Sequence, residues 1–345
     1  MAPALFIAAG LVCAITPPLA VAVTCTSQSE LSAAERASLT AAARHFGSLI
    51  DAGNASAVKM ETIPAVAEQF SGISAQIATL APITSAATLT VVGLYDLDAT
   101  DLTSAQDQTQ FFCGGANSPE VVFSIPQIPP GHYAVAMLHA TAVAKPQQMT
   151  FVLAQAPQAG IAPASAAGAA TNTGPTGPWM LAGLYVRPMT AAGHDGLWYW
   201  NKARAYAQSK QNWNAYFYLQ TAESLLVPVD FVGSPNLDKL IKEQNAVAPE
   251  ALPGEKPMNL SANGHSYSIT AMHTDGSLGA LDLVIAYQAA DNSDPVATRT
   301  RNVEVMHAML TQHPELREGF HGLWVYSNVA NQRTFANELP MAQIP

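Results

Sequence analysis

The pattern of apolar and polar positions divides the chain into stretches of different period. The first 29 residues carry no charged side chain, and an apolar run over 4–15 is followed by Pro17 and Pro18. A run of about a dozen apolar residues is short for a bilayer span, and Ala20 and Ala22 suit a signal peptidase. Residues 1–22 are therefore predicted to be a cleaved export signal, with a membrane anchor as the alternative.

From residue 30 to residue 81 the apolar residues recur at helical spacing. The pattern predicts a first helix through Leu31–Ile50, capped by Ser29 or Ser32, and a less regular second helix through Val66–Leu80. Pro82 is expected to end the second helix.

From residue 88 the period becomes two, which is typical of strands separated by Gly- and Pro-containing turns. The predicted strands are Thr88–Leu97, Gln110–Cys113, Glu120–Ile125, His132–Ala142, Met149–Ala154 and Trp179–Arg187. Such strands predict a curved antiparallel sheet with the preceding helices on one face. The Ala-, Gly- and Pro-rich stretch 155–178 is expected to be a long hairpin loop, with an interdomain linker as the alternative.

The remainder predicts an aromatic helical block followed by a second sheet. The helical segments are Leu197–Leu226 and Pro235–Gln244; the later strands are His265–His273, Leu281–Gln288 and Leu323–Val329, with a helix near Val296–Gln312 that Asp294 caps. The predicted fold class is α+β: N-terminal helices on a curved antiparallel sheet, a helical hairpin, and a small C-terminal α+β unit. The predicted domains are residues 30–190, 191–248 and 255–340.

Composition narrows the classes of partner. Apolar residues make up 49% of the chain and charged residues 12%, with a formal net charge of −10. Because the 15 Lys and Arg residues form no basic run, neither nucleic acid nor an anionic membrane is an expected partner.

Two cysteines, Cys25 and Cys113, remain after cleavage of the predicted signal. In an oxidising compartment they are expected to form one disulfide. The alternatives are two unlinked thiols, or a lipid-modified Cys25. Export would place the protein in the periplasm or outside the cell, with no membrane span after signal cleavage.

Two helices and long strands ending in Trp179-Met180-Leu181-Ala182-Gly183-Leu184-Tyr185-Val186 resemble the NTF2-like (cystatin-like) α+β cone over residues 30–190. Ala203, Tyr206, Ala215, Leu219 and Ala222 resemble one tetratricopeptide (TPR) helix pair, which is expected to bury Trp198, Trp200, Trp213 and Tyr216 between the two sheet units. The whole chain is similar to secreted bacterial proteins of unknown function.

The NTF2-like resemblance implies a pocket on the concave face of the first sheet. Alternation places Tyr133, Val135, Met137, His139 and Thr141 on one face, as it does Trp179, Leu181, Gly183, Tyr185 and Arg187. The candidate pocket residues are thus Tyr95, Asp96, Tyr133, His139, Tyr185 and Arg187; the alternative is an aromatic core with Arg187 at its rim.

Two other runs attract attention, Gly193–Gly196 and His313–His321. The first is expected to be a turn before a helix, and the second a helix end followed by a loop, because neither spacing matches a metal or protease motif. No metal or cofactor is predicted.

The sequence therefore predicts an exported, non-catalytic protein that binds a small molecule or an envelope protein, or acts as a scaffold. The alternative is a small-molecule hydrolase or isomerase using the first pocket. A carboxylate within hydrogen-bond reach of His139 inside a cavity would favour the enzyme, and a filled cone would favour the binding protein.

Overall fold

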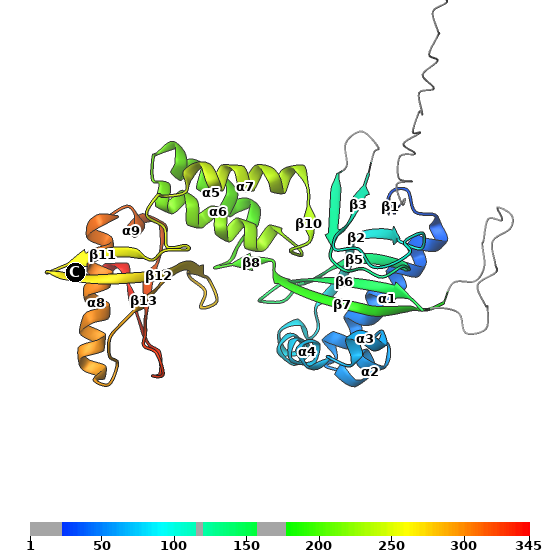
Figure 1. The fold of residues 1–345 in the computed structure, drawn as a ribbon, viewed down its shortest axis with the longest axis horizontal. Coiled ribbons are helices and arrows are strands. Elements are labelled where there is room, and N and C mark those ends of the chain that lie inside the picture. The colour runs from blue at the N-terminus through cyan, green and yellow to red at the C-terminus, as the bar shows by residue number, and fades with distance from the viewer. Residues whose placement is uncertain (1–22, 115–119, 157–176) are drawn as a thin grey trace, which may run out of the picture.

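The structure is a computed structural model that describes residues 23–114, 120–156 and 177–345. The predicted export signal and most of the stretch 155–178 lie outside these residues. The described chain is an α+β protein, as predicted, with two sheet-containing units side by side along the long axis of Figure 1. None of the helices within the described ranges is long and apolar enough to cross a membrane.

The first unit is built on a five-stranded antiparallel sheet. Its spatial order is β1 (Thr24–Ser27), β2 (Thr88–Asp98), β5 (His132–Thr141), β6 (Gln147–Gln155) and β7 (Trp179–Pro188). The four long strands carry the two-residue period seen in the sequence, since each strand alternates between two buried layers.

Helices cover one face of this sheet. They are α1 (Ala33–Asp51), α2 (Ala55–Met60), α3 (Pro64–Ala67) and α4 (Ser71–Thr84), with Pro82 inside α4. Ser32 and Glu35 form a capping box at the start of α1. The apolar stripe of α1, including Leu39, Phe46 and Ile50, packs with Leu138 and other sheet residues in one hydrophobic cluster.

The opposite face of the sheet is also covered. A small second sheet made of β3 (Thr109–Cys113), β4 (Val121–Ile125) and β10 (Val232–Gly233) supplies its side chains. Phe111 and Phe123 are fully buried in a cluster with Tyr133 and Val135 of the central strand. The face that the NTF2-like resemblance leaves open as a pocket is therefore filled by this small sheet.

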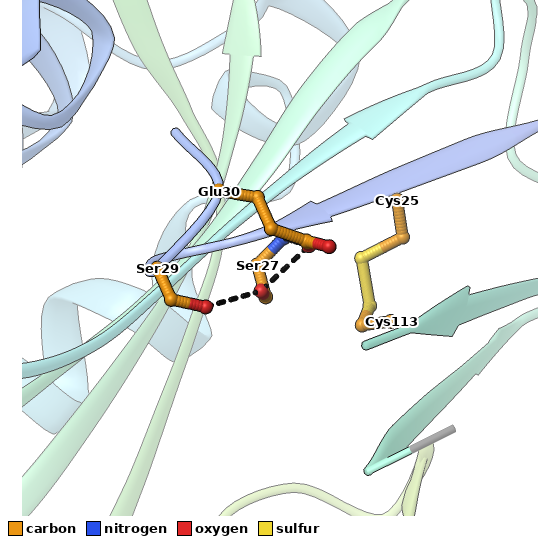
Figure 2. The surroundings of a disulfide bond; sticks show 5 residues. All are labelled: Cys25, Ser27, Ser29, Glu30 and Cys113. Carbon is orange, nitrogen blue, oxygen red and sulfur yellow. Dashed lines mark hydrogen bonds between the residues drawn. A yellow bond between two sulfur atoms is a disulfide. The ribbon is translucent and has the colours of Figure 1, made fainter. Parts of the chain in front are cut away.

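The predicted cysteine pair is confirmed in the geometry of the fold. Cys25 in β1 is bonded to Cys113 at the end of β3, with their Cα atoms 5.0 Å apart (Figure 2). Ser27, in the same strand as Cys25, donates its hydroxyl and its backbone N–H to the Glu30 carboxylate at 2.7 and 3.0 Å. The disulfide thus ties the edge of the large sheet to the small sheet.

Two irregularities change the faces that simple alternation predicts. The β2–β5 register shifts between Val91 and Gly93, and the β6–β7 register shifts at Ala182. Leu181 consequently packs with the helices, whereas Tyr185 lies on the side of the small sheet, against Phe231. The prediction that Leu181 shares a face with Gly183 and Tyr185 is wrong, because the β-bulge at Ala182 reverses the alternation, whereas Gly183 and Tyr185 do lie on one face.

The second unit combines helices and a sheet around one core. Its elements are β8 (Thr190–Ala191), β9 (His194–Asp195), α5 (Gly196–Gln208), α6 (Asn212–Leu226), α7 (Pro235–Val247), β11 (Met258–Ala262), β12 (His265–Asp275), β13 (Asp282–Gln288), α8 (Pro295–Gln312), α9 (Leu316–Gly319), β14 (Gly322–Asn328), β15 (Phe335–Pro340) and the 3-10 turn Met341–Gln343. A single hydrophobic cluster runs from Tyr199 to Ile344. The helical block therefore packs directly onto the C-terminal sheet.

The sheet of this unit has the order β11-β12-β13-β14-β15, in which only the β13–β14 pair is parallel. Helix α8 makes the crossover between those two strands, and Asp294 caps it with Pro295 in its first turn, as predicted. The parallel register places Leu283 opposite Leu323.

The aromatic residues of the helical block are not all buried. Trp200 and Trp213 keep 8% and 6% of their surface exposed, whereas Trp198 keeps 38%. The prediction of burial is wrong for Trp198, because its ring stacks on His194 at the surface instead of entering the core.

Candidate functional site

His139 lies in β5, and its partner there is an amide. Its Nε2 atom is 3.0 Å from Oε1 of Gln148 on the neighbouring strand β6. The carboxylate that an acid–base pair at this position requires does not approach it among the described residues.

Asp96 pairs with a different histidine. Its Oδ1 atom is 2.7 Å from Nε2 of His132, while His132 Nδ1 is 2.7 Å from Oε1 of Gln155. The ring of Trp179 packs edge-on against the imidazole. The pKa of His132 is raised chiefly by the hydrogen bond to Asp96, and burial opposes this rise. The sequence offered no signal for His132, which is the first residue of its strand.

Tyr95 and Tyr133 belong to the aromatic core under the small sheet. The ring of Tyr95 meets Phe123 edge-on at 5.0 Å between centroids, and the hydroxyl of Tyr133 donates to the carbonyl of Pro129 at 3.0 Å. Burial raises the pKa of both hydroxyls. Tyr95 therefore faces away from its neighbour Asp96, because consecutive strand residues point to opposite sides.

Tyr185 and Arg187 lie together, but next to the segment that follows α6. Arg187 forms an ion pair with Asp230, and Tyr185 packs edge-on against Phe231 at 5.2 Å. Tyr185 also lines a surface groove of about 740 Å³ beside β4 and β10. Within the described residues, the six predicted site residues are thus distributed over separate places of the first unit.

A cleft of about 710 Å³ lies between the two units. The β5–β6 turn and the end of β7 form one wall, and α6 and the β12–β13 loop form the other. The residues that line it are Ala144, Lys145, Gln147, Pro188, Thr190, Ala191, Ala192, Gly193, Thr221, Ser224, Leu225, Thr274, Asp275, Gly276, Ser277, Leu278, Gly279 and Leu281. A concave, mostly apolar surface with a few polar groups is how ligand sites are commonly built.

Several polar groups of the cleft form hydrogen bonds with other residues of the lining. The hydroxyls of Thr221 and Thr274 lie 2.7 Å apart and so join α6 to β12. Lys145 donates from Nζ to the carbonyl of Ser277 at 3.4 Å, a bond that joins the two units. Lys145 and Asp275 are the two charged residues of the lining, one of each sign.

A smaller pocket of about 310 Å³ adjoins the cleft and shares Ala192, Gly279 and Leu281 with it. The rings of His194 and Trp198 stack on its rim, 3.6 Å apart and nearly parallel. Behind them the Tyr199 hydroxyl donates to the Ala191 carbonyl at 2.8 Å, and burial raises the pKa of Tyr199 to about 12.

The same pocket is also lined by His321. The two runs noted in the sequence, Gly193–Gly196 and His313–His321, therefore meet here. Each has the local structure that was predicted: Asp195 caps α5 after the turn, and a helix end and the short α9 precede the loop at His321. Their proximity is a tertiary feature that spacing along the chain does not reveal.

Comparison of the chain with protein-family models, with curated proteins and with solved structures finds no match.

Proposed function

We propose that this protein is an exported binding protein that holds a small molecule in the cleft between its two units. The observation that carries the proposal is the cleft itself, a hollow of about 710 Å³ to which both units contribute. Its volume falls in the range of small-molecule sites, roughly 300–1,000 Å³. A ligand there would contact both walls at once.

The ligand is proposed to be polar and without a strong net charge. The lining offers hydroxyls, one amide, one Lys and one Asp, and so suits a neutral or zwitterionic molecule. Leu225, Leu278 and Leu281 supply the apolar contact.

Binding is preferred over catalysis because the enzyme alternative depends on His139. That histidine bonds to an amide, and the sheet face in question is filled by Phe111 and Phe123. A filled sheet face and a histidine bonded to an amide are what we expect of a binding protein and not of an enzyme at this position.

Export rests on the charge-free leader of the sequence and on the cysteine pair. A bonded Cys25–Cys113 pair suits an oxidising compartment such as the periplasm or the extracellular space. Cleavage after residue 22 would leave β1 near the new N-terminus. The disulfide at Cys25 would then hold β1 against the rest of the first unit.

The test is native mass spectrometry of the mature protein, residues 23–345, with a defined library of neutral and zwitterionic metabolites. We expect at least one compound to be retained at one copy per chain. A protein that retains no compound of the library would contradict the proposal.

A further inference from the structure

Three side chains meet at one end of the C-terminal sheet, where β13 and β14 begin. Asp282 opens β13, His321 immediately precedes β14, and Glu338 lies in β15. One ligand atom from each lies within 4.8 Å of the other two. The parallel β13–β14 register creates this meeting, because it sets Leu283 beside Leu323 and hence Asp282 beside Gly322.

The most buried member is the carboxylate of Asp282, whose side chain is 6% exposed. Its Oδ1 atom lies 3.0 Å from Nδ1 of His321, and its Oδ2 atom accepts a hydrogen bond from the indole N–H of Trp324 at 3.2 Å. Such a second bond fixes the orientation of a ligating carboxylate. The backbone of His321 is fixed too, since its N–H donates to the carbonyl of Leu281 at 2.8 Å.

The site also depends on the glycine between the two carboxylates. A Cβ atom on Gly322 would stand 2.9 Å from Oε1 of Glu338 and 3.1 Å from Oδ1 of Asp282. Both carboxylates therefore occupy space that any other residue at position 322 would fill. Within the described residues, the Glu338 carboxylate accepts no hydrogen bond from the protein. Two close carboxylates, one of them without a donor in the described part of the chain, favour an added positive charge.

We propose that Asp282, His321 and Glu338 bind one divalent transition-metal ion, for which Zn²⁺ is the probe. An oxygen and a nitrogen that bind the same Zn²⁺ stand roughly 3.0–3.4 Å apart, which the Asp282–His321 distance matches. Rotation of the Glu338 side chain brings in the third ligand. A mixed oxygen and imidazole set suits such ions better than Ca²⁺ or Mg²⁺.

Three protein ligands leave a coordination position open to water or to a ligand. The position is reachable, because the His321 side chain is 52% exposed and lines the 310 Å³ pocket beside the cleft. The proposal departs from the sequence analysis, which predicts no metal. It is also independent of the cleft ligand, since none of the three residues lines the cleft.

The test is calorimetric titration of Zn²⁺ into the metal-stripped mature protein, with wild type, Glu338→Gln and His321→Ala compared. We expect one ion per chain in wild type and an affinity at least about tenfold weaker in each variant. The matched control is Glu304→Gln, because Glu304 also pairs with a histidine of this unit, His265, and no third ligand joins them among the described residues. It should bind Zn²⁺ as wild type does.

Thermal melts of the metal-free variants check their folding. A wild type that takes up no Zn²⁺ would overturn the proposal. Equal affinities in wild type, Glu338→Gln and His321→Ala would overturn it as well, because the ion would then lie at another histidine.

Discussion

Asp96 Oδ1 lies 2.7 Å from Nε2 of His132, so the acid–histidine pair of the first sheet involves His132 and not His139. The two side chains are 18% and 29% exposed. The pair lies at the end of the sheet beside Trp179. Asp96, His132 and Trp179 line neither the cleft nor the groove. We therefore assign it a role in stability.

This pair predicts a pH-dependent contribution to stability. The folded-state pKa of His132 is raised above its ordinary value of 6.5, mainly by the hydrogen bond to Asp96. A raised pKa means that the stabilisation is full below about pH 6.5 and is lost as the pH rises through the folded-state value. Urea unfolding at several pH values should show the largest difference between wild type and His132→Gln on the acid side.

Asp96→Asn is the partner variant for this measurement. It should reproduce the pH dependence of His132→Gln, and the double variant should add little to either. A stability difference that stays constant between about pH 5 and pH 9 would contradict the assignment.

Loss of the disulfide should destabilise the first unit strongly. Cys25 and Cys113 are 88 residues apart, and closing a loop of that length restricts the unfolded chain by about 4–5 kcal/mol in the entropy model. We expect Cys25→Ser to lower the free energy of unfolding by a similar amount in urea titrations. Reductant should weaken wild type and leave the variant unchanged; an equal response of both would argue against the bond.

Burial distinguishes two tryptophans of the helical block. Trp213 is 6% exposed and packs in the shared core, so Trp213→Ala should cost about 3–5 kcal/mol through the cavity it leaves. Trp198 is 38% exposed, so Trp198→Ala should cost only about 1–2 kcal/mol. Chemical denaturation of both variants checks the order, and equal losses would show that the block packs differently.

At one wall of the cleft, the backbone of the β12–β13 loop lies close to the β8–β9 hairpin. A Cβ atom on Gly276 would meet Ala191 Cβ at 2.9 Å and the backbone N of Ala192 at 3.0 Å. Gly276→Ala should therefore lower the free energy of unfolding by about 1–3 kcal/mol, because the added methyl group would push the β12–β13 loop away from the β8–β9 hairpin. Gly254→Ala, with no atom within 4 Å, is the control and should melt like wild type.

Local pattern was sufficient to predict most of the secondary structure. The strand His132–Ala142 and the helix Val296–Gln312 are found within one residue of their predicted ends, because long stretches of one period leave little ambiguity. Strands β11 and β15 were missed: both are short and lie among prolines or polar residues that mask their alternation.

The candidate site was much less predictable, for two physical reasons. First, a single β-bulge at Ala182 places Tyr185 on the face opposite Leu181. Second, the small sheet covers the face where a pocket is expected. The cleft and the Asp282–His321 contact join segments that only tertiary packing brings together. Spacing along the chain carries no information on such meetings.

The most direct test of the central claim compares ligand affinity in two tryptophan variants. Ala144 is an exposed residue of the β5–β6 turn that lines the cleft, so Ala144→Trp would fill the hollow with little effect on the core. Ala75→Trp adds the same side chain to an exposed position of α4, outside the cleft lining.

The measurement is the dissociation constant of the compound retained by wild type, obtained by isothermal titration calorimetry. The account predicts at least about a tenfold loss of affinity, equivalent to 1.4 kcal/mol, in Ala144→Trp and an unchanged constant in Ala75→Trp. An Ala144→Trp protein that folds normally and binds the compound as tightly as wild type would contradict it.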